Sequence, residues 1–133
     1  MALQQLEIVE MIDWYDGIVM ALVTTNWIEG THLCSLLAFD IEHKKRVLAL
    51  LPLDESEVSE IRSRLNGEWE ALLAYLKHLW NEASGSITLV CYRDSDKQMM
   101  GEKVADASKL RNQAISDIEE AVSDNRKSWF SLF

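Results

Sequence analysis

The first 53 residues alternate short apolar runs with polar turns, a pattern typical of an antiparallel sheet. Four apolar runs have the length of strands, and they cover residues 5–12, 18–25, 31–39 and 46–53. The first run changes phase at Val9, which predicts a bulge or a strand with two apolar sides. The fourth run is apolar on both sides, so we expect a strand that is central in the sheet or covered by a helix.

Helical periodicity replaces this alternation at Asp54. Asp54 and Glu57 have the spacing of a capping box, and Leu53 and Val58 have that of a hydrophobic staple, which together predict a helix start. A second helix follows directly, because apolar residues recur there at i, i+3, i+4, i+7 and i+11. This apolar stripe consists of Trp69, Leu72, Leu73, Leu76 and Trp80.

Two further elements are predicted in the last third of the chain, a strand over 86–93 and a helix over 106–122. The segment between them, DSDKQMMGEK, shows no periodicity and is expected to be a loop. The predicted fold class is therefore α+β. We expect an antiparallel β-meander of about four N-terminal strands plus a fifth strand, with two consecutive helices and a C-terminal helix packed on one face.

The length of the chain favours a single domain over residues 1–133. Within it we expect a strand-rich half, a pair of helices and an aromatic tail, which cover 1–53, 54–82 and 128–133.

Acidic residues dominate the composition, with 22 Asp and Glu against 13 Lys and Arg and a formal net charge of −9. Residues 1–43 contain seven carboxylates and no Lys or Arg. Such a field argues against direct nucleic-acid binding and favours encounters with a basic protein partner. No apolar stretch reaches the length of a membrane span, no signal peptide is evident, and two cysteines make no disulfide framework, so we expect a cytoplasmic protein.

Motifs of catalysis or cofactor binding do not occur, so we expect neither an enzyme nor a bound cofactor or metal. A zinc site could be assembled from His32, Cys34 and Cys91 with His43 or His78, but the spacing does not require one. A Cys–His nucleophile built on the same thiols is disfavoured, because burial in apolar strands raises a thiol pKa.

The carboxylate pair Asp13 and Asp16 flanks Trp14 and Tyr15 in a predicted turn. A hydrolase using the two aspartates is one alternative. The interpretation that we favour is an acidic and aromatic surface, because tryptophan and tyrosine are enriched at interface hot spots. The predicted partner-binding residues are Asp13, Trp14, Tyr15, Asp16, Trp27, Glu29, Asp40 and Glu42.

These observations predict a small acidic protein-binding module that occupies a basic surface of its partner. An immunity-protein-like molecule or a phage-type inhibitor, acting in the cytoplasm of a bacterium or its phage, would fit this description. The alternative is a structural or assembly subunit that forms a homodimer or larger homo-oligomer through its tail. The apolar tail residues are Trp129, Phe130, Leu132 and Phe133. We expect them to dock either on a second copy or on their own chain, in a groove lined by Leu110, Ile118 and Trp80.

Overall fold

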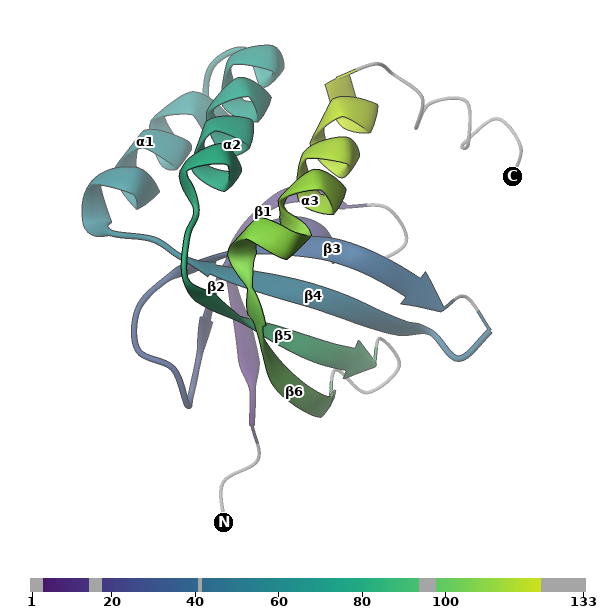
Figure 1. The fold of residues 1–133 in the computed structure, drawn as a ribbon. Coiled ribbons are helices and arrows are strands. Elements are labelled where there is room, and N and C mark those ends of the chain that lie inside the picture. The colour runs from purple at the N-terminus through teal and green to yellow at the C-terminus, as the bar shows by residue number, and fades with distance from the viewer. Residues whose placement is uncertain (1–3, 15–17, 41, 94–97, 123–133) are drawn as a thin grey trace.

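The computed structural model describes residues 4–14, 18–40, 42–93 and 98–122, which form a six-stranded antiparallel sheet and three helices (Figure 1). The strands lie side by side in chain order. Their bounds are β1 (Leu6–Trp14), β2 (Ile18–Thr25), β3 (His32–Asp40), β4 (Lys45–Pro52), β5 (Ser86–Arg93) and β6 (Gln98–Asp106). The helices are α1 (Glu55–Leu65) and α2 (Trp69–Glu82) between β4 and β5, and α3 (Ala107–Val122) after β6.

The predicted architecture was wrong in its number of strands. The segment expected to be a loop after residue 93 contains β6, which pairs with β5 from Gln98 to Asp106. This edge strand is largely exposed along its length, so its sequence carries no alternation of apolar and polar positions. The chain is α+β overall, but its sheet has six strands instead of five, and the last helix begins at Ala107.

Two predictions about the strands are confirmed. The pairing of β1 with β2 shifts in register between Ile8 and Glu10, which places a bulge at Val9. The fourth predicted strand, β4, pairs with β3 on one side and β5 on the other and is buried over most of its length. A strand that is covered on both faces has no polar side, which explains its continuous apolar run.

The start of α1 is the capping box that the sequence predicts. The Asp54 carboxylate accepts a hydrogen bond from the Glu57 backbone N–H at 2.8 Å, and Glu57 Oε1 accepts one from the Asp54 N–H at 2.9 Å. Leu53 and Val58 both pack against the core, as a hydrophobic staple requires. The cap fixes the point at which the chain leaves β4 and turns into the helical layer.

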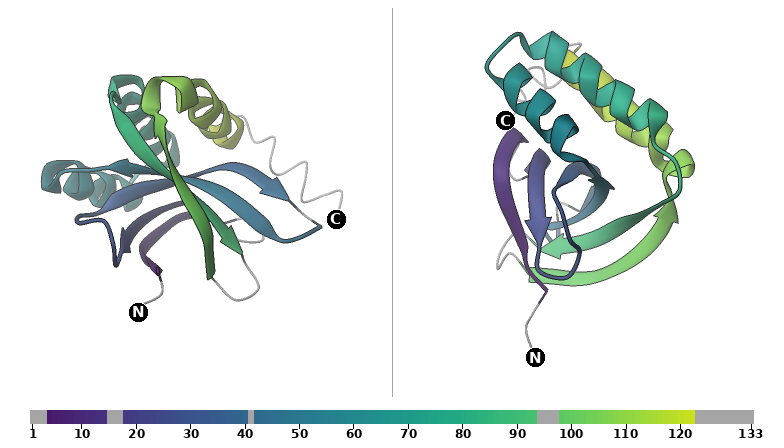
Figure 2. Two further views of the ribbon diagram at one scale, coloured as in Figure 1. Left: turned by 60° about the horizontal axis from the view of Figure 1, so that its bottom comes forward. Right: turned by 90° about the vertical axis from the view of Figure 1, so that its left-hand side faces the viewer.

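The three helices cover one face of the sheet, where the larger core lies (Figure 2). Trp80 of α2 is 0% exposed, and its indole N–H lies 3.4 Å from Ser35 Oγ of β3. Trp69 belongs to the same predicted apolar stripe, which was expected to face the core, but it is 40% exposed at the start of α2. None of the helices in the described ranges is long and apolar enough to cross a membrane.

A second, smaller core lies on the opposite face of the sheet, built from side chains such as Cys34, Leu48 and Leu50. It is enclosed because the sheet curls. Trp27 Nε1 donates to Glu102 Oε2 of β6 at 2.7 Å, which joins the β2–β3 turn to the last strand. In a flat sheet β2 and β6 would lie four strand spacings apart, on the order of 19 Å. The sheet therefore shields apolar side chains on both faces.

Candidate functional site: an acidic pole with a pocket

The structure divides the predicted partner-binding residues between the two ends of the sheet. Asp13 and Asp40 lie near the end that carries the β1–β2 and β3–β4 turns, together with Glu42. Trp27 and Glu29 belong to the β2–β3 turn, which lies at the opposite end. The residues therefore do not form one continuous face.

Two of the predicted aspartates, Asp13 and Asp40, belong to the sheet itself, one on β1 and one at the end of β3. Asp13 is half-buried on β1, opposite Met20 of β2. Asp40 accepts hydrogen bonds from the His43 ring at 2.9 Å and from the His43 backbone N–H at 3.2 Å, and these lower the pKa of its carboxyl. Asp40 thus stabilises the β3–β4 turn, and the cations Lys44 and Lys45 follow it, so this end of the sheet is mixed in charge.

The remaining predicted residues differ in their environments. Trp27 is half-buried, and its indole N–H donates to Glu102, which connects the β2–β3 turn to β6. Glu29 and Glu42 are exposed. Tyr15, Asp16 and the side chain of Trp14 lie outside the described residues. The predicted aromatic tail, Trp129, Phe130, Leu132 and Phe133, also lies outside them.

The residues considered for zinc do not converge on one site, because only His32 and Cys34 share a strand, β3. Cys34 points into the smaller core, whereas Cys91 pairs with Val47 and lies on the helical face of the sheet. His43 is in an exposed turn and His78 is exposed on α2. Among the described residues, no group of three or more His, Cys, Asp and Glu side chains could hold a metal. Burial raises the pKa of the Cys34 thiol to about 12, which makes it a poor nucleophile.

Carboxylates gather at the end of the sheet where β4 leads into α1 and α2 leads into β5. We call this surface the acidic pole, and in the described part of the chain it consists of Glu29, Asp54, Glu55, Glu57, Glu82 and Asp106. A hydrogen bond of 3.1 Å from the Leu53 N–H to the Thr31 carbonyl brings the loop of Glu29 to the start of α1. The nearby cations are Lys109 and Arg111 at the start of α3. Carboxylates thus outnumber cations at this pole.

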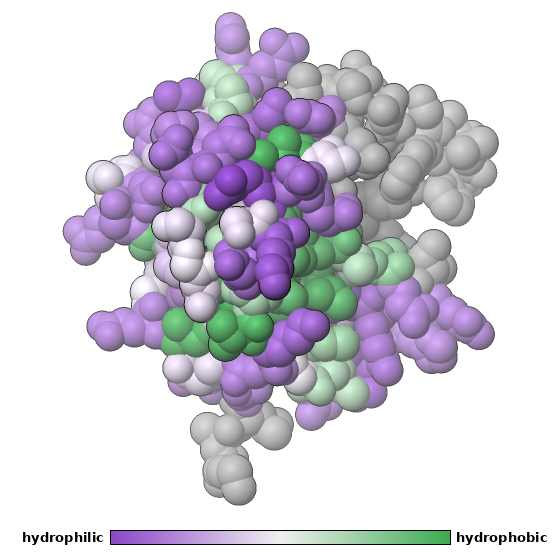
Figure 3. Space-filling model, in the orientation of Figure 1, coloured by the Kyte–Doolittle hydropathy of each residue, from purple (hydrophilic) through white to green (hydrophobic). Residues whose placement is uncertain are grey.

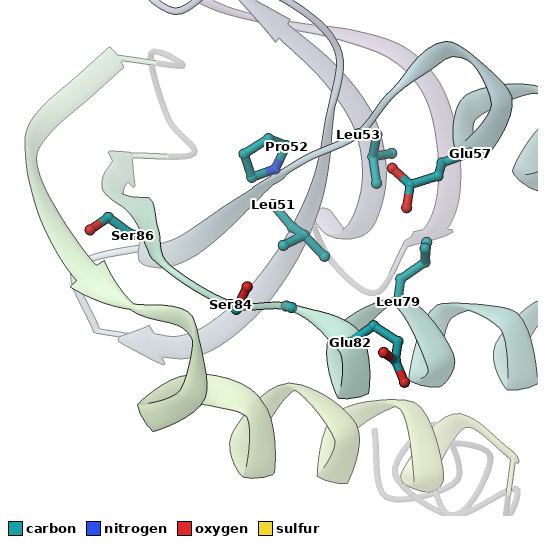
Figure 4. Close-up of a pocket in the computed structure, with 9 residues that line it drawn as sticks. Leu51, Pro52, Leu53, Glu57, Leu79, Glu82, Ser84 and Ser86 are labelled. Carbon is teal, nitrogen blue, oxygen red and sulfur yellow. The ribbon is translucent and has the colours of Figure 1, made fainter.

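A pocket of about 270 Å³ opens at the acidic pole (Figure 4). Its apolar lining comes from the end of β4 and from α2, and two serines line it where the chain enters β5. Glu57 reaches the pocket from α1 and Glu82 from the last turn of α2. The lining residues are Leu51, Pro52, Leu53, Glu57, Leu79, Glu82, Ala83, Ser84 and Ser86.

The capping box positions Glu57 at the pocket. One of its carboxylate oxygens, Oε1, accepts the hydrogen bond from the Asp54 N–H, so the side chain is held against the first turn of α1. In the part of the chain that the structure describes, Oε2 makes no hydrogen bond. The same interaction that starts the helix therefore orients a negative charge toward the pocket.

The other carboxylate of the pocket, Glu82, stands where helix electrostatics disfavour it. It is the last residue of α2, and the last turn of this helix contains no basic residue. The helix dipole places partial negative charge at that end, which repels a carboxylate. Arg111 from α3 compensates the helix end, because its guanidinium donates to the carbonyls of Trp80 at 3.1 Å and Ala83 at 2.7 Å.

This placement predicts that Glu82 lowers stability. Glu82→Gln should raise the free energy of unfolding by about 0.3–1 kcal/mol, because it removes a like charge from the C-terminal end of the helix dipole. Glu70→Gln is the matched control, since Glu70 is in the first turn of the same helix and should lower stability by a similar amount. Urea denaturation followed by circular dichroism measures both. A loss of stability on Glu82→Gln would contradict the electrostatic argument.

A second prediction concerns His32, which is 3% exposed at the start of β3. Its Nδ1 has no hydrogen-bond partner among the described residues, and burial lowers the pKa of its ring below 6.5, although a backbone hydrogen bond at Gly30 opposes part of this effect. The unfolded chain therefore binds a proton below about pH 6.5 while the folded chain does not. We expect stability to fall as the pH decreases from 6.5 toward the lowered pKa.

Urea denaturation between pH 7.5 and pH 5 tests this expectation. His32→Phe should flatten the pH dependence in that range, whereas His78→Gln, which changes an exposed histidine, should not. The lowered carboxyl pKa values of Asp40, Asp54 and Asp106 affect stability only near and below pH 3.8, so they do not contribute there. Equal slopes in the parent and in His32→Phe would show that His32 does not cause the effect.

Comparison with known proteins identifies no relative, since no family model, no curated protein and no solved structure matches this chain.

Proposed function

We propose that this protein is a small acidic protein-binding module that occupies a basic surface of a partner protein, in the manner of an immunity protein or a phage-type inhibitor. The observation that carries the proposal is the acidic pole, where carboxylates from the β2–β3 turn, α1, α2 and β6 lie at one end of the sheet and two of them, Glu57 and Glu82, line one pocket. The contact surface that we propose is therefore at the opposite end of the sheet from Asp13 and Asp40.

The charge of the whole chain supports the same kind of partner. A net charge of −9 on 133 residues creates a field that attracts basic surfaces and speeds their encounter. Figure 3 shows hydrophilic residues over much of the helical layer in this view, while hydrophobic residues come to the surface lower down, over the strands. Hydrophobic side chains near a charged rim provide the apolar area that a stable interface needs.

Affinity capture tests the proposal with the full chain as bait, in extracts of the cells that produce it, at low and at raised salt. Two bait variants are compared. The pole variant, Glu29→Gln with Glu55→Gln, removes two charges from the acidic pole, and the control variant, Glu42→Gln with Glu68→Gln, removes two exposed charges that lie away from it, in the β3–β4 turn and before the start of α2. Neither pair lines the pocket.

We expect one basic protein to be captured by the parent and the control variant at low salt, and to be reduced at raised salt and with the pole variant. Mass spectrometry identifies it, and reconstitution from purified components establishes direct binding. The proposal fails if the captured partner is acidic. It also fails if the amount captured changes neither with raised salt nor with the pole variant.

A second candidate is an assembly subunit, and the edge strand β6 is the observation that favours it. Val104 on this strand is 70% exposed, and Met100 is exposed as well. An exposed edge strand with apolar side chains is a template for pairing with another copy. Sedimentation of the parent and of Val104→Lys distinguishes the candidates, because an edge lysine blocks such pairing. A parent that is monomeric at all concentrations excludes this candidate.

A further inference from the structure

We propose that the pocket at the acidic pole receives a single Lys or Arg side chain of the basic partner. This inference rests on the proposed function and adds the contact that would hold the complex together. Its evidence is the combination of an apolar floor, made by residues such as Leu51 and Leu79, with the two carboxylates Glu57 and Glu82.

The size of the pocket suits one side chain. Its volume of about 270 Å³ lies just below the range of roughly 300–1,000 Å³ that is usual for small-molecule sites. A long cationic side chain buries its methylene stem against apolar surface and keeps its charged head near polar groups. Leu51, Leu53 and Leu79 provide the apolar surface, and the carboxylates provide the polar groups.

Both carboxylates can accept hydrogen bonds from a new donor. Glu82 makes no hydrogen bond or ion pair in the described part of the chain, and Glu57 has Oε2 unengaged there. Ser84 and Ser86 line the β5 side of the pocket, and a serine hydroxyl can accept a hydrogen bond as well. A cation between the two glutamates would also relieve the unfavourable charge at the end of α2.

The location of Glu82 is an independent indication of binding. A glutamate at a helix C-terminus contradicts the local rule of helix electrostatics. Residues that break such rules without a structural benefit are found at functional sites, where stability is reduced in favour of binding. Glu82 lines the pocket, so the residue that lowers the stability of the helix is also one that would contact the bound side chain.

Titration of the isotope-labelled full chain followed by NMR tests the inference. The probes are Nα-acetyl-lysine methylamide, its arginine equivalent, and Nα-acetyl-norleucine methylamide, which has an apolar side chain without the charge. We expect saturable shifts of the Leu53, Ala83 and Ser84 amides with the cationic probes, and contacts between the probe methylenes and the Leu79 methyl groups. The norleucine probe should give no saturable shifts.

The pocket variant for this test is Glu57→Gln with Glu82→Gln. Glutamine at the third helical position can still complete the capping box, so the start of α1 is preserved while the charge is removed. We expect the pocket variant to bind the lysine probe about fivefold or more weakly than the parent, since two exposed charge contacts are lost. The control variant, Glu42→Gln with Glu68→Gln, should bind as the parent does.

The inference is overturned if the probe shifts spread over the whole acidic surface, or if the pocket variant and the control variant lose binding equally. Its failure is separable from that of the proposed function. A captured basic partner together with an empty pocket would mean that the partner uses another part of the acidic pole. If the probes bind specifically but no basic partner is captured, the inference about the pocket is supported and the proposed function is contradicted.

Discussion

Trp80→Ala is expected to lower the free energy of unfolding by about 3–5 kcal/mol, the usual cost of deleting a buried tryptophan. Trp80 is fully buried between α2 and the sheet, and its indole N–H is directed at Ser35 Oγ. The deletion leaves a cavity at the centre of the larger core, which the packed helices cannot fill by relaxation alone. Because domains of this size are stable by only about 5–15 kcal/mol, the variant should be close to unfolding at 37 °C.

Trp69→Ala is the matched control, since Trp69 belongs to the same apolar stripe of the same helix. It is 40% exposed, so its replacement should cost about 1 kcal/mol or less. Urea denaturation of both variants, followed by circular dichroism, provides the comparison. Equal losses would contradict the packing of α2 described above, whereas a ratio of three or more would support it.

Arg46→Ala is expected to lower the free energy of unfolding by about 3 kcal/mol. Arg46 is buried on β4, where its Nη1 donates to the Ile18 carbonyl at 3.1 Å and its guanidinium lies 4.0 Å from the centre of the Phe39 ring. Its removal leaves a buried carbonyl without this donor and exposes one end of the smaller core. Both effects destabilise the curled part of the sheet.

Arg46→Lys separates the shape of the side chain from its charge. A lysine keeps the positive charge but cannot stack its head as a plane on Phe39 or reproduce the fork of donors. We expect a loss between those of the parent and of Arg46→Ala, measured by the same denaturation experiment. If Arg46→Lys equals the parent in stability, the planar contact with Phe39 contributes nothing measurable.

The sequence was sufficient to predict the elements that have a strong local signal. The capping box at Asp54, the bulge near Val9 and the central position of β4 each follow from a pattern within a few residues, and each is confirmed. β6 has no such pattern, because an edge strand exposed on both faces is specified by pairing with β5 instead of by its own periodicity. The curl of the sheet, which depends on the contact of Trp27 with Glu102, is likewise a tertiary feature.

The candidate site was harder to predict, because its residues are brought together only by topology. Glu29, Glu57 and Glu82 are separated along the chain, and the sequence connects them only through the meander and the return of α2 to β5. Residues 1–43 contain seven carboxylates and no Lys or Arg, and this local pattern favours Asp13 and Asp40 instead. One local signal was present: Glu82 ends a helix that has no basic residue in its last turn.

The salt dependence of association between this protein and its captured partner tests the central claim most directly. Stopped-flow association rates would be measured from low to raised ionic strength for the parent, the pole variant (Glu29→Gln with Glu55→Gln) and the control variant (Glu42→Gln with Glu68→Gln). We predict that the parent and the control variant associate quickly at low salt and slow steeply as salt is added. The pole variant should associate about fivefold more slowly at low salt and show a flatter dependence. Identical rates and slopes for all three proteins would contradict the assignment of the acidic pole as the surface that meets the partner.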